Sequence, residues 1–243
     1  MTSPPTSQPP EGPVTPPDAT QEPHLAEENG DRPAPSGTEL QETLGPYKLV
    51  GYLGQGGMAI VYEAIAPDGR KVALKVIQET PFLPAGMLDR FRREADAAKT
   101  LGDHPNIVSV YDTGQVGNNH YIAMEHVPGG STLAHVIHDG IRPIPVSLQL
   151  AITIADALHY AHVNGIIHRD VKPGNVLMTA TGDPLLADFG LARLDADFGP
   201  NLTATSLSVG TPRYMAPEQA SSLKAATHLS DMYSFGVIIY EVL

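Results

Sequence analysis

The composition of the chain changes abruptly at Tyr47, and this change limits which residues can form a core. Residues 1–46 hold eleven of the 23 prolines, no aromatic residue and few aliphatic ones, so they cannot bury enough apolar surface to offset the entropy lost on ordering. They also carry eight acidic side chains against one basic one. We expect a disordered, Pro-rich acidic tail over 1–46, either purely solvating or docking to a partner, and a folded domain over 47–243.

The first part of the folded region has the pattern of an antiparallel sheet. Turns containing glycine or proline separate short segments rich in Val, Ile, Leu and Tyr. The five strand candidates are 47–53, 59–66, 71–77, 107–111 and 120–124. Residues 87–101 place apolar side chains at helical spacing. These patterns predict a small lobe of five antiparallel strands with one main helix.

After Pro128 the pattern becomes mostly helical, which predicts a second lobe and an α+β fold. Helices are expected over 133–138, over 148–162 behind an N-cap at Ser147, and over 231–243. The last is apolar nearly all round, which is typical of a helix in the middle of a core. Because the chain stops inside it at Leu243 without a stop signal, we expect a truncated lobe and a fragment of a longer polypeptide.

Charge and composition exclude several classes of protein. The formal net charge of −12 argues against nucleic acid as a partner, because phosphate-backbone binding needs clustered Lys and Arg. The chain has no Cys, so disulfides and thiolate metal sites are excluded. No run approaches the roughly 18 apolar residues that span a bilayer, and no signal peptide is evident. We expect a cytoplasmic protein.

Two polar segments in the helical half contain the candidate catalytic and metal-binding residues. The run from His168 to Asn175 contains Asp170 and Lys172, and Asp188 follows Asn175 by thirteen residues. An Asp can accept a hydroxyl proton, and a Lys two residues on can neutralise developing charge. Asn and Asp supply the oxygen ligands that a hard cation such as Mg²⁺ prefers. This combination is typical of phosphoryl transfer.

The glycines between the first two strand candidates suit a loop that binds phosphate. Around Gly54, Gly56 and Gly57 the backbone can approach phosphate oxygens because no Cβ intervenes. A simple tight hairpin is the alternative interpretation.

Lys75 and Glu94 give a second indication of a phosphate-binding site. Strand alternation puts Ala73 and Lys75 on one face, a small apolar surface beside a cation. Glu94 falls within the apolar stripe of helix 87–101, where a carboxylate needs a cationic partner. We expect a Lys75–Glu94 ion pair; the alternatives are a solvent-exposed Lys75 and a Glu94 that reaches the rim or pairs with Arg90.

Taken in order, these residues resemble the protein kinase superfamily. The matching set is Gly54, Lys75, Glu94, Asp170, Asn175, Asp188, Glu218 and Asp231. The resemblance spans 47–243, although Ala59 replaces the third glycine of the family pattern. Lys172 and Thr211 are typical of Ser/Thr kinases, and 53–59 and 214–219 look most like the bacterial, Pkn-type branch. The resemblance implies the two-lobed kinase fold.

The resemblance also implies a site for ATP with Mg²⁺, or Mn²⁺ in its place. Asp170, Lys172, Lys75 and Glu94 would be catalytic, and Asn175 and Asp188 would hold the metal. Met124 would be the gatekeeper beside the adenine. The nucleotide would contact Leu53, Gly54, Gln55, Gly56, Gly57, Met58, Ala59, Ile60, Val61, Ala73, Lys75, Glu125, Val127 and Leu177.

Regulation and partners follow from the same resemblance. Thr203 and Thr205 would be autophosphorylated, Arg169 would receive the phosphate, and Thr211 would lie near the substrate. Proteins with Ser or Thr hydroxyls would be substrates, and a kinase-domain dimer and a membrane segment beyond Leu243 are further expectations. The alternatives are a pseudokinase scaffold and, less favoured because of the Ala-Pro-Glu run at 216–218, a small-molecule kinase.

Overall fold

The computed structural model describes most of the folded region. The described residues are 43–56, 59–80, 83, 86–102, 104–140, 142–189, 212–222 and 225–243. Within these ranges, the side chains of Arg90, Glu94 and Pro212 are not described. The tail expected over 1–46 therefore lies largely outside the described residues. Its last part differs from the expectation, because Thr43–Leu44 form a short strand, β1, paired with residues 47 and 48.

The N-terminal lobe is one antiparallel sheet with the strand order β1-β2-β3-β4-β6-β5. Its other strands are β2 (Tyr47–Gly56), β3 (Ala59–Ile65), β4 (Lys71–Gln78), β5 (Val110–Val116) and β6 (Asn119–Glu125). All five expected strands are present, and β1 adds a sixth. The strand expected over 107–111 begins only at Val110, because Ile107 instead bridges to Leu186.

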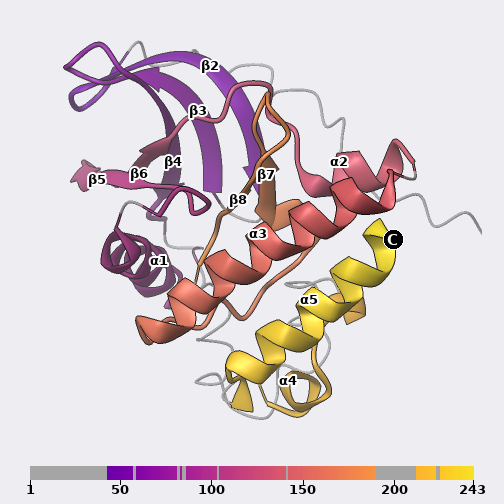
Figure 1. The fold of residues 1–243 in the computed structure, drawn as a ribbon. Helices are drawn as coiled ribbons and strands as arrows, with labels where there is room; N and C mark the ends of the chain where they lie inside the picture. Colours follow the sequence, from indigo (N-terminus) through magenta and orange to yellow (C-terminus); the bar gives the residue numbers. More distant parts are fainter. Residues whose placement is uncertain are drawn as a thin grey trace, which may run out of the picture. The chain divides into compact units, whose positions relative to one another are not determined.

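The sheet curls until its two ends meet. The Tyr47 hydroxyl of β2 donates to Asp112 Oδ2 of β5 at 3.0 Å, and Tyr121 of β6 donates to the same oxygen at 3.4 Å. The two tyrosine rings contact edge to face, with centroids 5.3 Å apart. Burial and the hydrogen bond to Asp112 raise the pKa of Tyr47. The curl is visible in Figure 1 and gives the sheet a concave face.

The single long helix of this lobe, α1 (Met87–Leu101), begins and ends where the sequence predicts. Strand alternation sends Val72, Leu74 and Val76 of β4 into the cluster around Tyr47, and sends Ile77 the other way, onto Phe91 and Ala95 of α1. Ala73 and Lys75 share the parity of Ile77 in β4. They therefore lie on the face of the sheet that α1 covers (Figure 1).

The second lobe is mainly helical. Its elements are α2 (Leu133–His138), α3 (Ile144–Val163), η1 (Pro173–Asn175), β7 (Val176–Met178), β8 (Pro184–Leu186), η4 (Pro212–Tyr214), α4 (Pro217–Ser221) and α5 (His228–Val242). Figure 1 shows α3 and α5 side by side. Ile154 and Leu158 of α3 and Phe235 and Ile238 of α5 belong to one buried cluster.

Helix α3 begins four residues earlier than predicted. Ile144 and Pro145 occupy its first turn, where proline is tolerated because its fixed φ suits a helix and its missing N–H would have no partner. The N-cap assignment of Ser147 is therefore wrong. Ser147 is buried inside the helix, and its hydroxyl donates to the carbonyl of Val242 at 2.6 Å, which ties α3 to the end of α5.

Helix α3 is also long and apolar enough, by length and composition, to cross a membrane, contrary to the expectation of no such run. Its packing gives another explanation for this composition. Leu150, Ile154, Leu158 and Ala161 line one face and are buried in the core cluster of the lobe. A helix at the centre of a folded core has the same apolar character as a membrane span.

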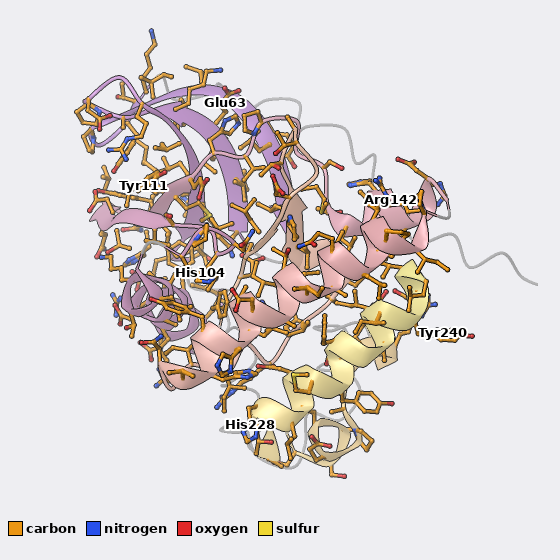
Figure 2. All side chains as sticks on the ribbon, viewed as in Figure 1. Glu63, His104, Tyr111, Arg142, His228 and Tyr240 are labelled. Carbon is orange, nitrogen blue, oxygen red and sulfur yellow. The ribbon has the colours of Figure 1, made fainter. Side chains whose placement is uncertain are left out.

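Helix α5 begins at His228, behind an N-cap at Thr227 whose hydroxyl accepts from the N–H of Leu229 at 3.2 Å. The sequence predicted its start at Asp231, three residues later, and in the described structure only one face of the helix is buried. Its buried face includes the polar residues Ser230, Asp231 and Ser234, while Tyr240 on the outer face is 84% exposed and points away from the lobe (Figure 2). These polar residues are buried because they form hydrogen bonds with other segments of the second lobe.

Candidate active site

Lys75 on β4 meets Asp188 of the second lobe. Its Nζ lies 2.9 Å from Asp188 Oδ1, and the Lys75 side chain is only 12% exposed. The solvent-exposed alternative for Lys75 is thus excluded. The expected Lys75–Glu94 pair stays a prediction, because the Glu94 side chain is outside the described residues although its backbone lies in α1, next to buried Ala95.

Asp170 is held by two neighbours from its own loop. Lys172 Nζ lies 2.8 Å from Asp170 Oδ2, and Asn175 Nδ2 donates to the same oxygen at 3.0 Å and to the Asp170 carbonyl at 2.8 Å. The short 3₁₀ turn η1 folds the chain back so that Asn175 can reach Asp170. The carboxylate, the cation and the amide therefore lie together, as the loop sequence predicts.

The backbone brings the two expected metal ligands together. The N–H of Ala187, the residue before Asp188, donates to the Asn175 carbonyl at 2.9 Å. Lys75 thus contacts Asp188, the residue before Asp188 binds Asn175, and Asn175 binds Asp170. In the described part of the chain, no group of three His, Cys, Asp or Glu could hold a metal ion. The donor set fits Mg²⁺, which binds one or two protein side chains and completes its shell with phosphate and water oxygens.

Two residues of this site have a strained backbone. Arg169 has φ 69° and Asp188 has φ 61°, and they are the only non-glycine residues with positive φ in the described part of the chain. Such a conformation costs about 1–3 kcal/mol and persists only where the surroundings enforce it. One strained residue precedes Asp170 and the other is a predicted metal ligand, so the strain lies at the candidate site and is maintained by the contacts around it.

Asp231 of α5 enforces the strained turn at Arg169. Its carboxylate is 1% exposed and accepts from Arg169 N at 2.7 Å and from His168 N at 2.8 Å. His162 Nε2 of α3 lies 2.8 Å from the same carboxylate. Asp231 belongs to the set of residues that resembles the kinase family, but no role was predicted for it. The available signal was an acidic residue near the start of a mainly apolar helix.

His168 and Phe189 pack against each other in the core of the second lobe. Both are almost fully buried, and their rings lie 4.5 Å apart between centroids. His168 Nε2 lies 3.0 Å from the carbonyl of Ala187, so it also links the loop of residues 168–175, the predicted catalytic loop, to the residue before Asp188.

The residues expected around an adenine ring line a common apolar region. Ala73 is 7% exposed and pairs with Met124 across the sheet. Met124 packs in a cluster that also contains Val127 and Leu177. Val61 lies opposite Lys75, so it is on the same face of the sheet. Leu53, by contrast, is 42% exposed.

The segment that joins the lobes is braced at Glu125. Its N–H donates to the Ser109 carbonyl at 2.9 Å, and its carboxylate accepts from Ser109 N at 3.3 Å. The Glu125 N–H and side chain are therefore engaged within the protein.

The glycine hairpin is paired close to its tip. Gly54 lies opposite Val61, Gln55 opposite Ile60, and Gly56 opposite Ala59. The two remaining residues, Gly57 and Met58, lie outside the described residues, as do Thr203, Thr205 and Thr211. Roles predicted for these five positions stay predictions. Arg169 is described, and both of its backbone groups are hydrogen-bonded.

The segment 212–222 is attached to one face of α5. Ser234 Oγ donates to the Tyr214 carbonyl at 2.6 Å, and Tyr214 donates to the buried Glu241 at 2.8 Å. Ser230 Oγ donates to Glu218 at 2.6 Å, and this hydrogen bond lowers the pKa of the Glu218 carboxyl. None of these contacts was predicted from the sequence. The polar residues of α5 can be located in the sequence, but the residues that they bind lie at distant positions of the chain.

Comparison with known proteins agrees with this geometry. The family model described as protein kinase domain matches residues 47–243. The chain is 43% identical over 205 residues to a probable serine/threonine-protein kinase, SCO3848, of Streptomyces coelicolor, which covers 82% of this chain. It is 42% identical to the serine/threonine-protein kinase PknB of Mycobacterium tuberculosis (81% of this chain) and 38% identical to PrkC of Bacillus subtilis (82%).

The chain spans 30–32% of the length of these relatives. The match covers both lobes, including the hairpin around Gly54, the run from His168 to Asn175, and Asp188. With a family model matching most of its length, the chain belongs to the protein kinase family.

Proposed function

We propose that this protein transfers the γ-phosphoryl group of ATP to Ser or Thr hydroxyls of protein substrates. The observation that carries the proposal is the chain of contacts in which Lys75 binds Asp188, the neighbouring Ala187 binds Asn175, and Asn175 and Lys172 bind Asp170. These side chains come from both lobes and meet at one place. The relatives are named as serine/threonine-protein kinases, which supports the same class of reaction.

In this proposal Asp170 accepts the proton of the attacking hydroxyl. Lys172, 2.8 Å from Asp170, stabilises negative charge on the group being transferred, and Asn175 holds the Asp170 carboxylate in place. Asn175 and Asp188 would hold Mg²⁺ or Mn²⁺, which neutralises phosphate charge when bound. Lys75 would bind phosphate oxygens of the nucleotide.

The nucleotide base would lie against the apolar region of Ala73, Val61, Met124 and Leu177. These side chains offer flat apolar contact, while the backbone near Val127 offers polar groups for the edge of the ring. The glycines at the tip of the β2–β3 hairpin would cover the phosphates.

Regulation and location are proposals of the same kind. Phosphate on Thr203 or Thr205 would add negative charge in a segment that follows Asp188, and Arg169 would receive it. A cytoplasmic location is proposed because ATP is the co-substrate and the chain has no Cys. A dimer of the domain and a membrane segment beyond Leu243 are further proposals.

Transfer of radiolabelled γ-phosphate by the full-length natural protein tests the function. We expect labelled phosphoserine or phosphothreonine in the wild type and at least a hundredfold less in Asp170→Asn, because the base is lost and an amide cannot accept the proton in the same way. Asp139→Asn, an exposed position at the end of α2, is the matched control and should transfer normally.

Two results would count against the proposal. Equal labelling in wild type and Asp170→Asn would favour the pseudokinase scaffold, with the label arising from a contaminant. Transfer to a small molecule but to no protein would favour the small-molecule kinase. Mapping the label to Thr203 or Thr205 would support the regulatory proposal.

A further inference from the structure

Gln219 is a buried polar residue that the proposed reaction does not use. It lies in the five-residue helix α4, and only 4% of its surface is exposed. Its side-chain amide joins two segments that are distant in sequence. Oε1 accepts from the N–H of Ala216 at 3.1 Å, and Nε2 donates to the carbonyl of Arg169 at 2.9 Å.

The contact to Ala216 explains how the side chain is oriented. Pro217 is the first residue of α4 and Gln219 the third, and a glutamine at the third position can reach back to the N–H of the residue before the helix. This fixes the oxygen of the amide toward Ala216. The NH₂ group is then directed at the catalytic loop.

The contact to Arg169 completes the restraint of a strained peptide. Arg169 has φ 69°, and its N–H is bound by Asp231 Oδ1 at 2.7 Å. Gln219 binds its carbonyl. The residue before Asp170 is therefore held from both sides, by a carboxylate of α5 and by an amide of α4.

The same amide links the catalytic loop to segment 212–216. This segment is attached to α5 through Ser234 and Tyr214, and a small hollow beside it is lined by Arg169, Asp170, Tyr214, Met215 and Gln219 together with Val171 and Ser234. Asp231 and Ser234 attach the loop and the segment to α5 separately. Gln219 binds the loop and the segment directly to each other.

We propose that Gln219 is a positioning residue that sets the orientation of Asp170 relative to segment 212–216 through its hydrogen bond to the Arg169 carbonyl. This inference rests on the proposed function. Gln219 acts through Arg169 and need not touch either substrate. Its loss should lower kcat, while KM for ATP should stay unchanged, because Gln219 is not among the residues proposed to contact the nucleotide.

Gln219→Glu separates the two hydrogen bonds. An ionised carboxylate still accepts from Ala216 N but cannot donate, and it repels the Arg169 carbonyl, so kcat should fall roughly 10- to 100-fold at pH 8. As the pH falls toward 5 the introduced carboxyl gains a proton and can donate again. The ratio of variant to wild-type kcat should therefore rise as the pH falls.

Gln219→Met serves as the comparison, because it keeps the volume and loses both hydrogen bonds. Its activity should be low, and its ratio to wild type should not change with pH. Asp170 of the loop and Asp231 and Glu218 of the adjoining helices are present in all three proteins, so the ratios isolate the effect of the residue at position 219. Gln149→Leu, on the exposed face of α3, controls for the general effect of losing a glutamine.

Hydrogen exchange of a peptide covering 168–172 gives a readout that does not need activity. In Gln219→Met this peptide should exchange at least several-fold faster than in wild type, while a peptide from β4 is unchanged. Unchanged exchange would overturn the inference even if no protein proved active. If wild type transfers phosphate and both Gln219 variants match its kcat, the inference is wrong and the proposed function stands.

Discussion

Replacing Asp231 with Asn tests how the catalytic loop is held. The carboxylate receives three donors on two oxygens: Arg169 N on Oδ1, and His168 N and His162 Nε2 on Oδ2, all within 2.8 Å. An amide has one acceptor oxygen. In either orientation its NH₂ group faces at least one backbone N–H, which then has no acceptor.

The cost can be worked from these contacts. A buried N–H without a partner costs about 1–3 kcal/mol, and the surviving hydrogen bonds lose the help of the negative charge, about 1 kcal/mol more. We expect Asp231→Asn to lower the free energy of unfolding by about 2–4 kcal/mol. The strained Arg169 peptide can then relax, so phosphate transfer should fall as well.

Urea unfolding followed by circular dichroism measures the first effect, and the transfer assay measures the second. Asp156→Asn is the control, because this α3 carboxylate is 72% exposed and its contact with His104 is 3.8 Å long; its effect should stay below about 0.5 kcal/mol. If Asp231→Asn were as stable and as active as Asp156→Asn, the idea that Asp231 enforces the turn would be refuted.

Two further predictions concern the curled sheet. Tyr47→Phe removes the hydrogen bond to Asp112 and should cost about 1.5–3 kcal/mol at neutral pH. Because the pKa of Tyr47 is raised in the folded state, its contribution is complete below pH about 10 and is lost as the pH rises further; urea midpoints measured from pH 8 to 11 should fall more steeply in wild type than in Tyr47→Phe. Gly114→Ala should cost about 1–3 kcal/mol, since the added Cβ would enter the Tyr121 side chain opposite it; a thermal midpoint equal to that of wild type would contradict this.

Local patterns predicted the elements of this fold well. Helix α1 has its predicted bounds because the apolar spacing from Leu88 to Leu101 is regular and Gly102 follows it. Helix α3 was misplaced at its start because Ser147 suits an N-cap, whereas the distant Val242 carbonyl provides the partner that favours Ser147 inside the helix. Propensity cannot detect such a partner.

The candidate site was also predictable only in part. The loop around Asp170 was predictable, because Lys172 and Asn175 lie within five residues of it. The supports from Gln219 and Asp231 were not predicted, since they join the loop to positions fifty or more residues away. A buried polar side chain is evident only when the packing around it is known.

Binding of ATP measured by calorimetry, with and without Mg²⁺, tests most directly whether residues of both lobes form one nucleotide site. The wild type should bind one ATP at least tenfold more tightly with Mg²⁺ than with a chelator present, and Asp188→Asn should abolish most of that difference. Lys75→Met should weaken binding in both conditions. Affinity that is the same with and without Mg²⁺, and unchanged in both variants, would contradict the account.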